Sequence, residues 1–170
     1  MLRVTTLLAL VLAAKACPDP DLCANSDCGS CGNACCNITV AVTEATATTM
    51  SMLNSSIVSG GPDGAYKAQM TYEGTLGFAD LRAYSKPVDF IGQAIHTTTG
   101  ENHFEDSVSF TIAPSASGGS LIQAFSYSLI AGAYCDEGQN YYNIMHLVDS
   151  LDWLSTPEVS FSGSCLPPAK

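Results

Sequence analysis

Apolar and polar residues alternate in several short segments of the chain, which is the pattern of half-buried β-strands. The clearest case is segment 107–112, where valine, phenylalanine and isoleucine alternate with serine and threonine. Segment 121–129 has its large apolar residues on one face and serines on the other. Residues 115–120, Ser-Ala-Ser-Gly-Gly-Ser, have the composition of a turn. The sequence therefore predicts that these two strands pair as an antiparallel hairpin.

Three further segments have strand-like patterns. Residues 38–42 and 66–72 alternate in the same way, and residues 90–98 are rich in strand-forming side chains although both faces are mixed. Between them, residues 76–89 predict an irregular crossing with a helical turn near residues 78–81.

Two segments favour helices. Residues 44–54 predict a helix with Thr43 as its cap. Apolar residues at helical spacing predict a second helix over 140–154, which Pro157 ends. The order β-α-β-β-β-β-α predicts an α+β fold, an antiparallel sheet of about four to five strands with helices packed on one face. Residues 38–170 are expected to form this single domain.

The N-terminal residues have the features of a secretory signal peptide. Arg3 precedes an apolar run over 7–14, and small residues flank Lys15 immediately before Cys17. The run is too short to span a bilayer as a helix. We therefore expect residues 1–16 to be removed and the protein to be secreted, extracellular or in the lumen of the secretory pathway. A lipoprotein anchored at Cys17 is the minor alternative.

Six cysteines lie within twenty residues and define a cysteine-rich arm over 17–37, whose other residues are mainly turn formers. Such a segment buries too little apolar surface to order itself, so disulfides are expected to stabilise it. The CxxC spacing at 28–31 is also that of a zinc or redox site, but an oxidising compartment favours disulfides and no metal. The expected disulfide-bonded residues are Cys17, Cys23, Cys28, Cys31, Cys35, Cys36, Cys135 and Cys165. The last two would pair with each other or each with the arm.

The net charge of the chain is −10. Removal of residues 1–16 leaves four basic residues against sixteen acidic ones. Such a surface repels nucleic acids and anionic membranes, so neither is expected as a partner. No second apolar stretch approaches spanning length, which predicts no membrane association after signal removal. Asn37 and Asn54 begin glycosylation sequons and are predicted to be glycosylated.

Segment 136–140, Asp-Glu-Gly-Gln-Asn, has two interpretations. Its oxygens are suited to a polar ligand or to Ca²⁺, although it lacks the spacing of an EF-hand. The interpretation that we favour is a turn with Gly138 at positive φ and with Asn140 or Asp136 capping the following helix.

The remaining polar residues match no catalytic motif. His96 and His103 flank an acidic loop, but no histidine pair has metal-ligand spacing, and no GxSxG elbow is present. We therefore predict no catalytic residue and no cofactor, and we favour a non-enzymatic role without excluding an enzyme. The residues predicted to contribute to binding are His96, Ser126, Ser128, Asp136 and Asn140.

Three segments together resemble a known family. They are Phe-Glu-Asp-Ser-Val-Ser-Phe at 104–110, a serine-rich strand at 124–128, and a motif at 136–144 that matches D-x-G-x-N-x-x-R-I in order and spacing. This pattern is similar to an uncharacterised bacterial and plant family, the domain of unknown function fourteen-ninety-nine, over about residues 86–151. Asn143 and Leu129 stand where that family usually has arginines. The resemblance implies the fold but no activity.

These observations predict a secreted, disulfide-stabilised binding module. Its partner would be another extracellular protein or a small apolar ligand held between sheet and helices, where such folds often have pockets. The alternative is an extracellular, hydrolase-like enzyme that uses a polar cleft near His96 and Asp136. A third possibility is a surface protein whose arm, 17–37, is the interaction module.

Overall fold

The computed structural model describes residues 34–133 and 136–161, which form an antiparallel seven-stranded sheet and two α-helices. The strands are β1 (Cys35–Val42), β2 (Tyr66–Ala68), β3 (Phe78–Asp80), β4 (Phe90–Thr97), β5 (Glu105–Pro114), β6 (Ser120–Ser128) and β7 (Glu158–Phe161). Their order in the sheet is β2-β4-β5-β6-β1-β7, and β3 also pairs with β4. The predicted α+β class is confirmed, whereas the expected four to five strands were too few.

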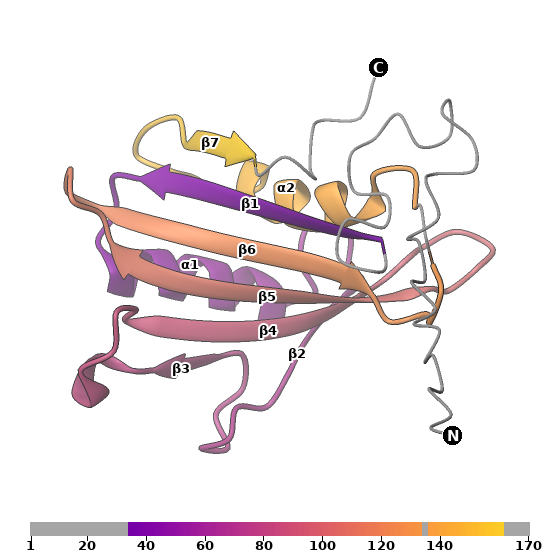
Figure 1. Ribbon diagram of the computed structural model, residues 1–170, viewed down its shortest axis with the longest axis horizontal. Helices are drawn as coiled ribbons and strands as arrows, with labels where there is room; N and C mark the ends of the chain where they lie inside the picture. The colour runs from indigo at the N-terminus through magenta and orange to yellow at the C-terminus, as the bar shows by residue number, and fades with distance from the viewer. Residues whose placement is uncertain (1–33, 134–135, 162–170) are drawn as a thin grey trace, which may run out of the picture.

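Both helices, α1 (Thr46–Val58) and α2 (Gln139–Asp149), cover the same face of the sheet (Figure 1). We call this the inner face and the opposite one the outer face. Alternate residues of β1, β4, β5 and β6 are buried on the inner face, because successive side chains of a strand point to opposite sides. They pack against Leu53 and Ile57 of α1 and Ile144, Leu147 and Val148 of α2. Core side chains thus fill the space between the sheet and the helices in which an apolar ligand was expected.

The predicted hairpin is confirmed as β5 and β6, joined through residues 115–119. The second helix is shorter than predicted. It ends at Asp149, and Leu154, which was expected to belong to its apolar stripe, is 85% exposed. Trp153 explains part of the difference, because its indole nitrogen donates to the carbonyl oxygen of Val148 and so satisfies one of the last helical carbonyls.

The segment before β4 differs from its prediction. Residues 78–80 form a strand, and the helical turn, a short 3-10 turn, comes later at Arg82–Tyr84. Phe78 is buried over Gly92, which has no side chain to block the ring, and lies 6.0 Å from Phe110 between ring centroids. The apolar contact of Phe78 with the core therefore favours strand pairing with β4 over a local helical turn.

Three other features differ from the sequence predictions. The first helix begins at Thr46 with Ala45 at the cap position, so Thr43 is not its cap. The Thr43 hydroxyl instead shares a hydrogen bond with that of Ser155. The strand expected over 66–72 stops at Ala68, after which a turn closed by hydrogen bonds between Thr71 and Thr75 begins. Strand β7 was not predicted at all.

Cys35 and Cys36 are buried neighbours in β1, so their side chains point to opposite faces of the sheet and a bond between the two is not expected. The signal peptide, the rest of the arm, Cys135 and Cys165 lie outside the described residues, so their predictions stay untested. Asn37 is exposed on β1, whereas Asn54 is half-buried in α1 with its side-chain oxygen buried. Within the described part of the chain, neither helix has the length and apolar content needed to cross a membrane.

Candidate ligand-binding site

A buried polar network lies at the end of the sheet where β5 begins, β6 ends and α2 starts. Asp106 of β5 is paired across the sheet with His96 of β4 on one side and with Ser128 of β6 on the other. It lies on the inner face, in line with Val108 and Phe110, and is only 3% exposed. A carboxylate thus occupies a position that the strand pattern otherwise gives to core residues.

Asn143 of α2 connects the helix to this carboxylate. Its side-chain nitrogen donates to Asp106 Oδ2 at 2.8 Å and to Ser126 Oγ at 3.2 Å. Its side-chain oxygen accepts from Gln139 Nε2 at 2.7 Å. Asn143 and Ser126 are fully buried, so these bonds replace the water that both side chains lose on folding.

Asp136 organises the start of α2. Its Oδ1 accepts from the Gly138 backbone nitrogen at 3.2 Å, and its Oδ2 accepts from that of Asn140 at 3.0 Å. The Asn140 side chain also donates to Asp136 and accepts from Ser126 Oγ at 2.6 Å. Of the two predicted caps, Asp136 is therefore the one that satisfies free N–H groups, and Asn140 as the cap was wrong. Asn140 instead joins α2 to β6.

Gly138 has φ of +85°, which confirms the predicted positive φ. Replacing Gly138 by valine is expected to lower the free energy of unfolding by at least about 1–2 kcal/mol, because L-residues resist this conformation and β-branched ones resist it most. Chemical denaturation would measure the loss. The matched control is Gly100→Val, because Gly100 does not have a positive φ and has open space around it, so this variant should keep nearly the native stability. A Gly138 variant as stable as the native protein would contradict the argument.

His96 belongs to a neighbouring arrangement. Its Nε2 lies 2.9 Å from Asp63 Oδ2, and its ring lies 4.6 Å from that of Tyr66. The Tyr66 hydroxyl donates to the backbone oxygen of Asn143 at 2.8 Å. Burial, with the charge of Asp63 as a smaller cause, raises the pKa of Tyr66, so this hydroxyl stays protonated and can act as the donor. His96 therefore packs against Tyr66, and Tyr66 in turn binds the backbone of α2 at Asn143.

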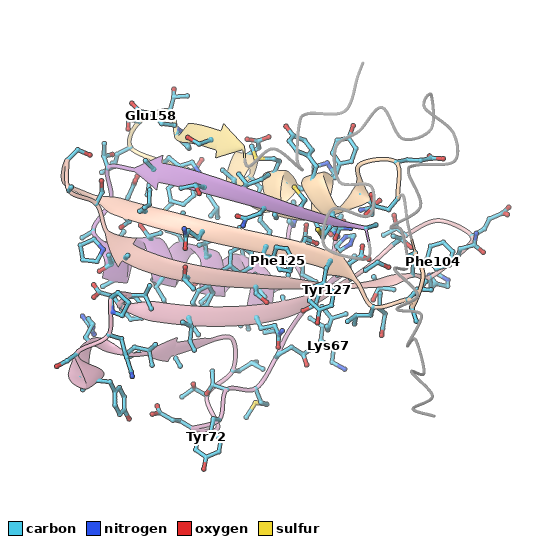
Figure 2. All side chains as sticks on the ribbon, viewed as in Figure 1. Lys67, Tyr72, Phe104, Phe125, Tyr127 and Glu158 are labelled. Atoms are coloured by element: carbon cyan, nitrogen blue, oxygen red, sulfur yellow. The ribbon has the colours of Figure 1, made fainter. Side chains whose placement is uncertain are left out.

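A cavity of about 660 Å³ opens above the network. Its walls are residues 98–102 and Phe104 of the β4–β5 connection together with Asp106, Ser128, Ile130, Ala133, Asp136, Glu137 and Gln139. We call it the acidic cleft. Figure 2 labels Phe104, one of its lining residues, at this end of the sheet.

The structure divides the five predicted binding residues into three groups. Ser128 and Asp136 line the acidic cleft, Ser126 and Asn140 are fully buried behind it, and His96 does not line it. The arrangement expected of a hydrolase, with His96 and Asp136 in one cleft, is not what the described residues form.

Sequence reasoning missed Asp106, Asn143 and Gln139 as parts of the site. Asp106 had a detectable signal, because a charged residue in the apolar register of a strand must find buried partners. Asn143 had a weaker one, since it lies next to Ile144 on a helix whose apolar residues mark the buried side.

The electrostatics of the cleft are dominated by carboxylates. The pKa of Asp106 is raised, mainly by burial and further by the charge of Asp136, against the lowering effect of the hydrogen bonds from Asn143 and Ser128 and of the charge on His96. Glu101 and Glu137 also line the cleft, and no lysine or arginine is among its described lining residues. Among residues 34–133 and 136–161, no group of three or more potential ligands is arranged to hold a metal ion.

No protein-family model, curated protein or solved structure matches the chain. The resemblance of residues 86–151 to the fourteen-ninety-nine family therefore stays a prediction, and the nature of the ligand has to be inferred from the chemistry of the site.

Proposed function

We propose that the protein is a secreted, disulfide-stabilised binding module that holds a small organic cation, an amine or a guanidinium compound, in the acidic cleft. The observation that carries the proposal is the environment of Asp106. This carboxylate is almost fully buried and lines the cleft, where it has neutral hydrogen-bond donors and no lysine or arginine among the described lining residues. Its basic neighbour on β4, His96, is itself paired with Asp63 and does not line the cleft.

A buried carboxylate is costly unless its charge is compensated. Asn143 and Ser128 offset part of the cost, yet the pKa of Asp106 remains raised by burial and by the charge of Asp136. A cation in the cleft would attract both carboxylates and remove their mutual repulsion. The resembled family usually has arginine where this chain has Asn143, and an arginine there would supply a positive charge from within the protein. A bound cation would supply that charge from outside.

The size and lining of the cleft favour an organic cation. A volume of about 660 Å³ lies in the range of small-molecule sites and far exceeds the volume of a single ion. Phe104, 46% exposed, offers an aromatic ring, whose face attracts cations. Ile130 and Ala133 provide apolar contacts for the carbon skeleton of the ligand. The net charge of −10 would also draw cations towards the protein.

Calorimetric titration with agmatine, which carries an amine and a guanidinium group, tests the proposal. Agmatine is expected to bind with an affinity that falls as salt is added, whereas the uncharged 1,4-butanediol should not bind. Replacing Asp106 by asparagine should weaken agmatine binding at least tenfold, because the buried negative charge is removed.

The matched control is Glu158→Gln, which removes an exposed carboxylate at the opposite end of the sheet (Figure 2). This variant should bind agmatine as the native protein does. Equal binding by the native and Asp106→Asn proteins, or no binding of agmatine at low salt, would refute the proposal.

A further inference from the structure

A second cavity, of about 640 Å³, lies on the outer face near β3, the lowest strand in Figure 1. Its floor consists of residues from three neighbouring strands, Ala79 of β3, Ile91 and Gln93 of β4 and Ser109 of β5. One wall is residues 69–73, and the other comes from the β3–β4 connection. We call this cavity the outer groove.

The two walls of the outer groove are connected to each other. The Tyr84 hydroxyl, from the β3–β4 connection, donates to Glu73 Oε1 on the opposite wall at 2.7 Å. The wall that carries Glu73 is itself closed by hydrogen bonds between Thr71 and Thr75. The groove is therefore formed before any ligand enters, which lowers the entropic cost of binding.

Large apolar side chains are exposed around the outer groove instead of joining the core. Tyr72 is fully exposed, Met70 is 63% exposed and Tyr84 is 54% exposed. Figure 2 shows Tyr72 at the edge of the molecule, far from the acidic cleft and Phe104. Exposed apolar groups gathered at one cavity mark a binding surface more often than single exposed residues do.

We propose that the outer groove binds a neutral carbohydrate, a chain of pyranose rings with equatorial hydroxyl groups. Such a ring has two apolar C–H faces, which can stack on the tyrosines, and a polar rim. Gln69, Gln93 and Ser109 line the groove and offer amide and hydroxyl groups to that rim. One acidic and one basic residue, Glu73 and Lys86, line it as well, so the charges balance and suit an uncharged ligand.

The floor of the groove favours a sugar over a wholly apolar ligand. The Gln93 side chain donates to Ser107 Oγ at 3.0 Å and to Ser109 Oγ at 3.4 Å, which holds the amide in place at the floor. An apolar molecule would cover this amide without replacing its hydrogen bonds to water, at a cost in free energy. A sugar hydroxyl would replace them.

The outer groove shares no described lining residue with the acidic cleft. Carbohydrate binding would therefore be a second activity, independent of the proposed cation binding.

Saturation-transfer NMR and calorimetry with cellohexaose, a β-linked neutral glucan, test the inference. Cellohexaose is expected to bind the native protein, and Tyr72→Ala should weaken binding at least tenfold, as should Gln93→Ala. Because Tyr72 is fully exposed, its variant should keep the native melting temperature, so that a loss of binding would not reflect unfolding.

Tyr142→Ala is the matched control, since Tyr142 is an exposed tyrosine of α2 outside the outer groove. It should bind cellohexaose as the native protein does. No transfer to cellohexaose at millimolar concentration, or transfer that Tyr72→Ala leaves unchanged, would overturn the inference. Displacement of cellohexaose from the groove by agmatine would also overturn it, because the two sites would not be independent.

Discussion

Replacing Asn143 by leucine is expected to lower the free energy of unfolding by about 3 kcal/mol or more. Leucine has a similar volume but no polar atoms. The substitution removes the hydrogen bonds that Asn143 makes to Asp106 and Ser126 and the one that it accepts from Gln139. The largest part of the loss comes from Asp106, which stays buried with one donor fewer. Urea denaturation at neutral pH would measure it.

Asn102→Leu serves as the control, because Asn102 is an exposed asparagine of the β4–β5 connection. Its stability should stay within about 0.5 kcal/mol of the native value. The double variant Asp106→Leu, Asn143→Leu should recover part of the loss, since replacing both members of a buried polar pair leaves no unpaired charge. An Asn143→Leu protein as stable as the native one would show that the network contributes little to folding.

Replacing Asp106 by asparagine is expected to stabilise the unliganded protein at neutral pH and to remove part of its pH dependence. The pKa of Asp106 in the folded state is raised above the ordinary 3.8, so the folded protein holds this proton more readily than the unfolded chain does. The stabilisation from this proton is fully present below pH 3.8 and is lost as the pH rises through the folded-state pKa. Asparagine has no such proton to lose.

The substituted amide can keep the local hydrogen bonds, because its oxygen can accept from Asn143 while its nitrogen donates to Ser128. The measurement is the difference in unfolding free energy between the two proteins from pH 4 to pH 8. The pKa of Asp80 is lowered to about 2 by its hydrogen bonds with Arg82, so its contribution to stability is lost as the pH falls. This contribution is the same in both proteins and cancels in their difference. A difference that stays constant with pH, or that favours the native protein as the pH rises, would contradict the raised pKa.

Acidification should also release the proposed cation, since protonation of Asp106 removes the charge that binds it. The same titratable group would therefore link stability, ligand affinity and pH. Agmatine should stabilise the native protein most at neutral pH and progressively less as Asp106 takes up a proton.

Several features of the fold could be read directly from the sequence. Strands β5 and β6 were predicted because each has one apolar face long enough to show the alternation, and a glycine-serine turn joins them. Helix α2 was predicted from its apolar spacing, and Gly138 from its place in a turn. In β5 and α2 the apolar face that marks the element in the sequence is also the face that it buries. Strand β6 instead buries the face that carries its serines, together with Ile122 and Ala124, and leaves Phe125 and Tyr127 half-buried on the outer face.

Other elements depend on partners that lie far away in the chain. Strands β3 and β7 have three and four residues, too few for a periodic pattern, and they exist because β4 and β1 offer them pairing edges. The length of α1 was misjudged at both ends for the same reason. Glu44, just before it, accepts a hydrogen bond from the backbone of Leu154, 110 residues later in the chain.

The candidate site also combines residues that local sequence patterns place with residues that only distant contacts bring together. The sequence by itself determined that Ser128 and Asp136 are polar residues placed at a strand end and at a helix start, because local patterns define those ends. Only the tertiary structure decided that Asp106 and Asn143, 37 residues apart, share a buried hydrogen bond and that a cleft opens above them. The burial of a charge is set by every segment packed around it, and no local pattern contains that information.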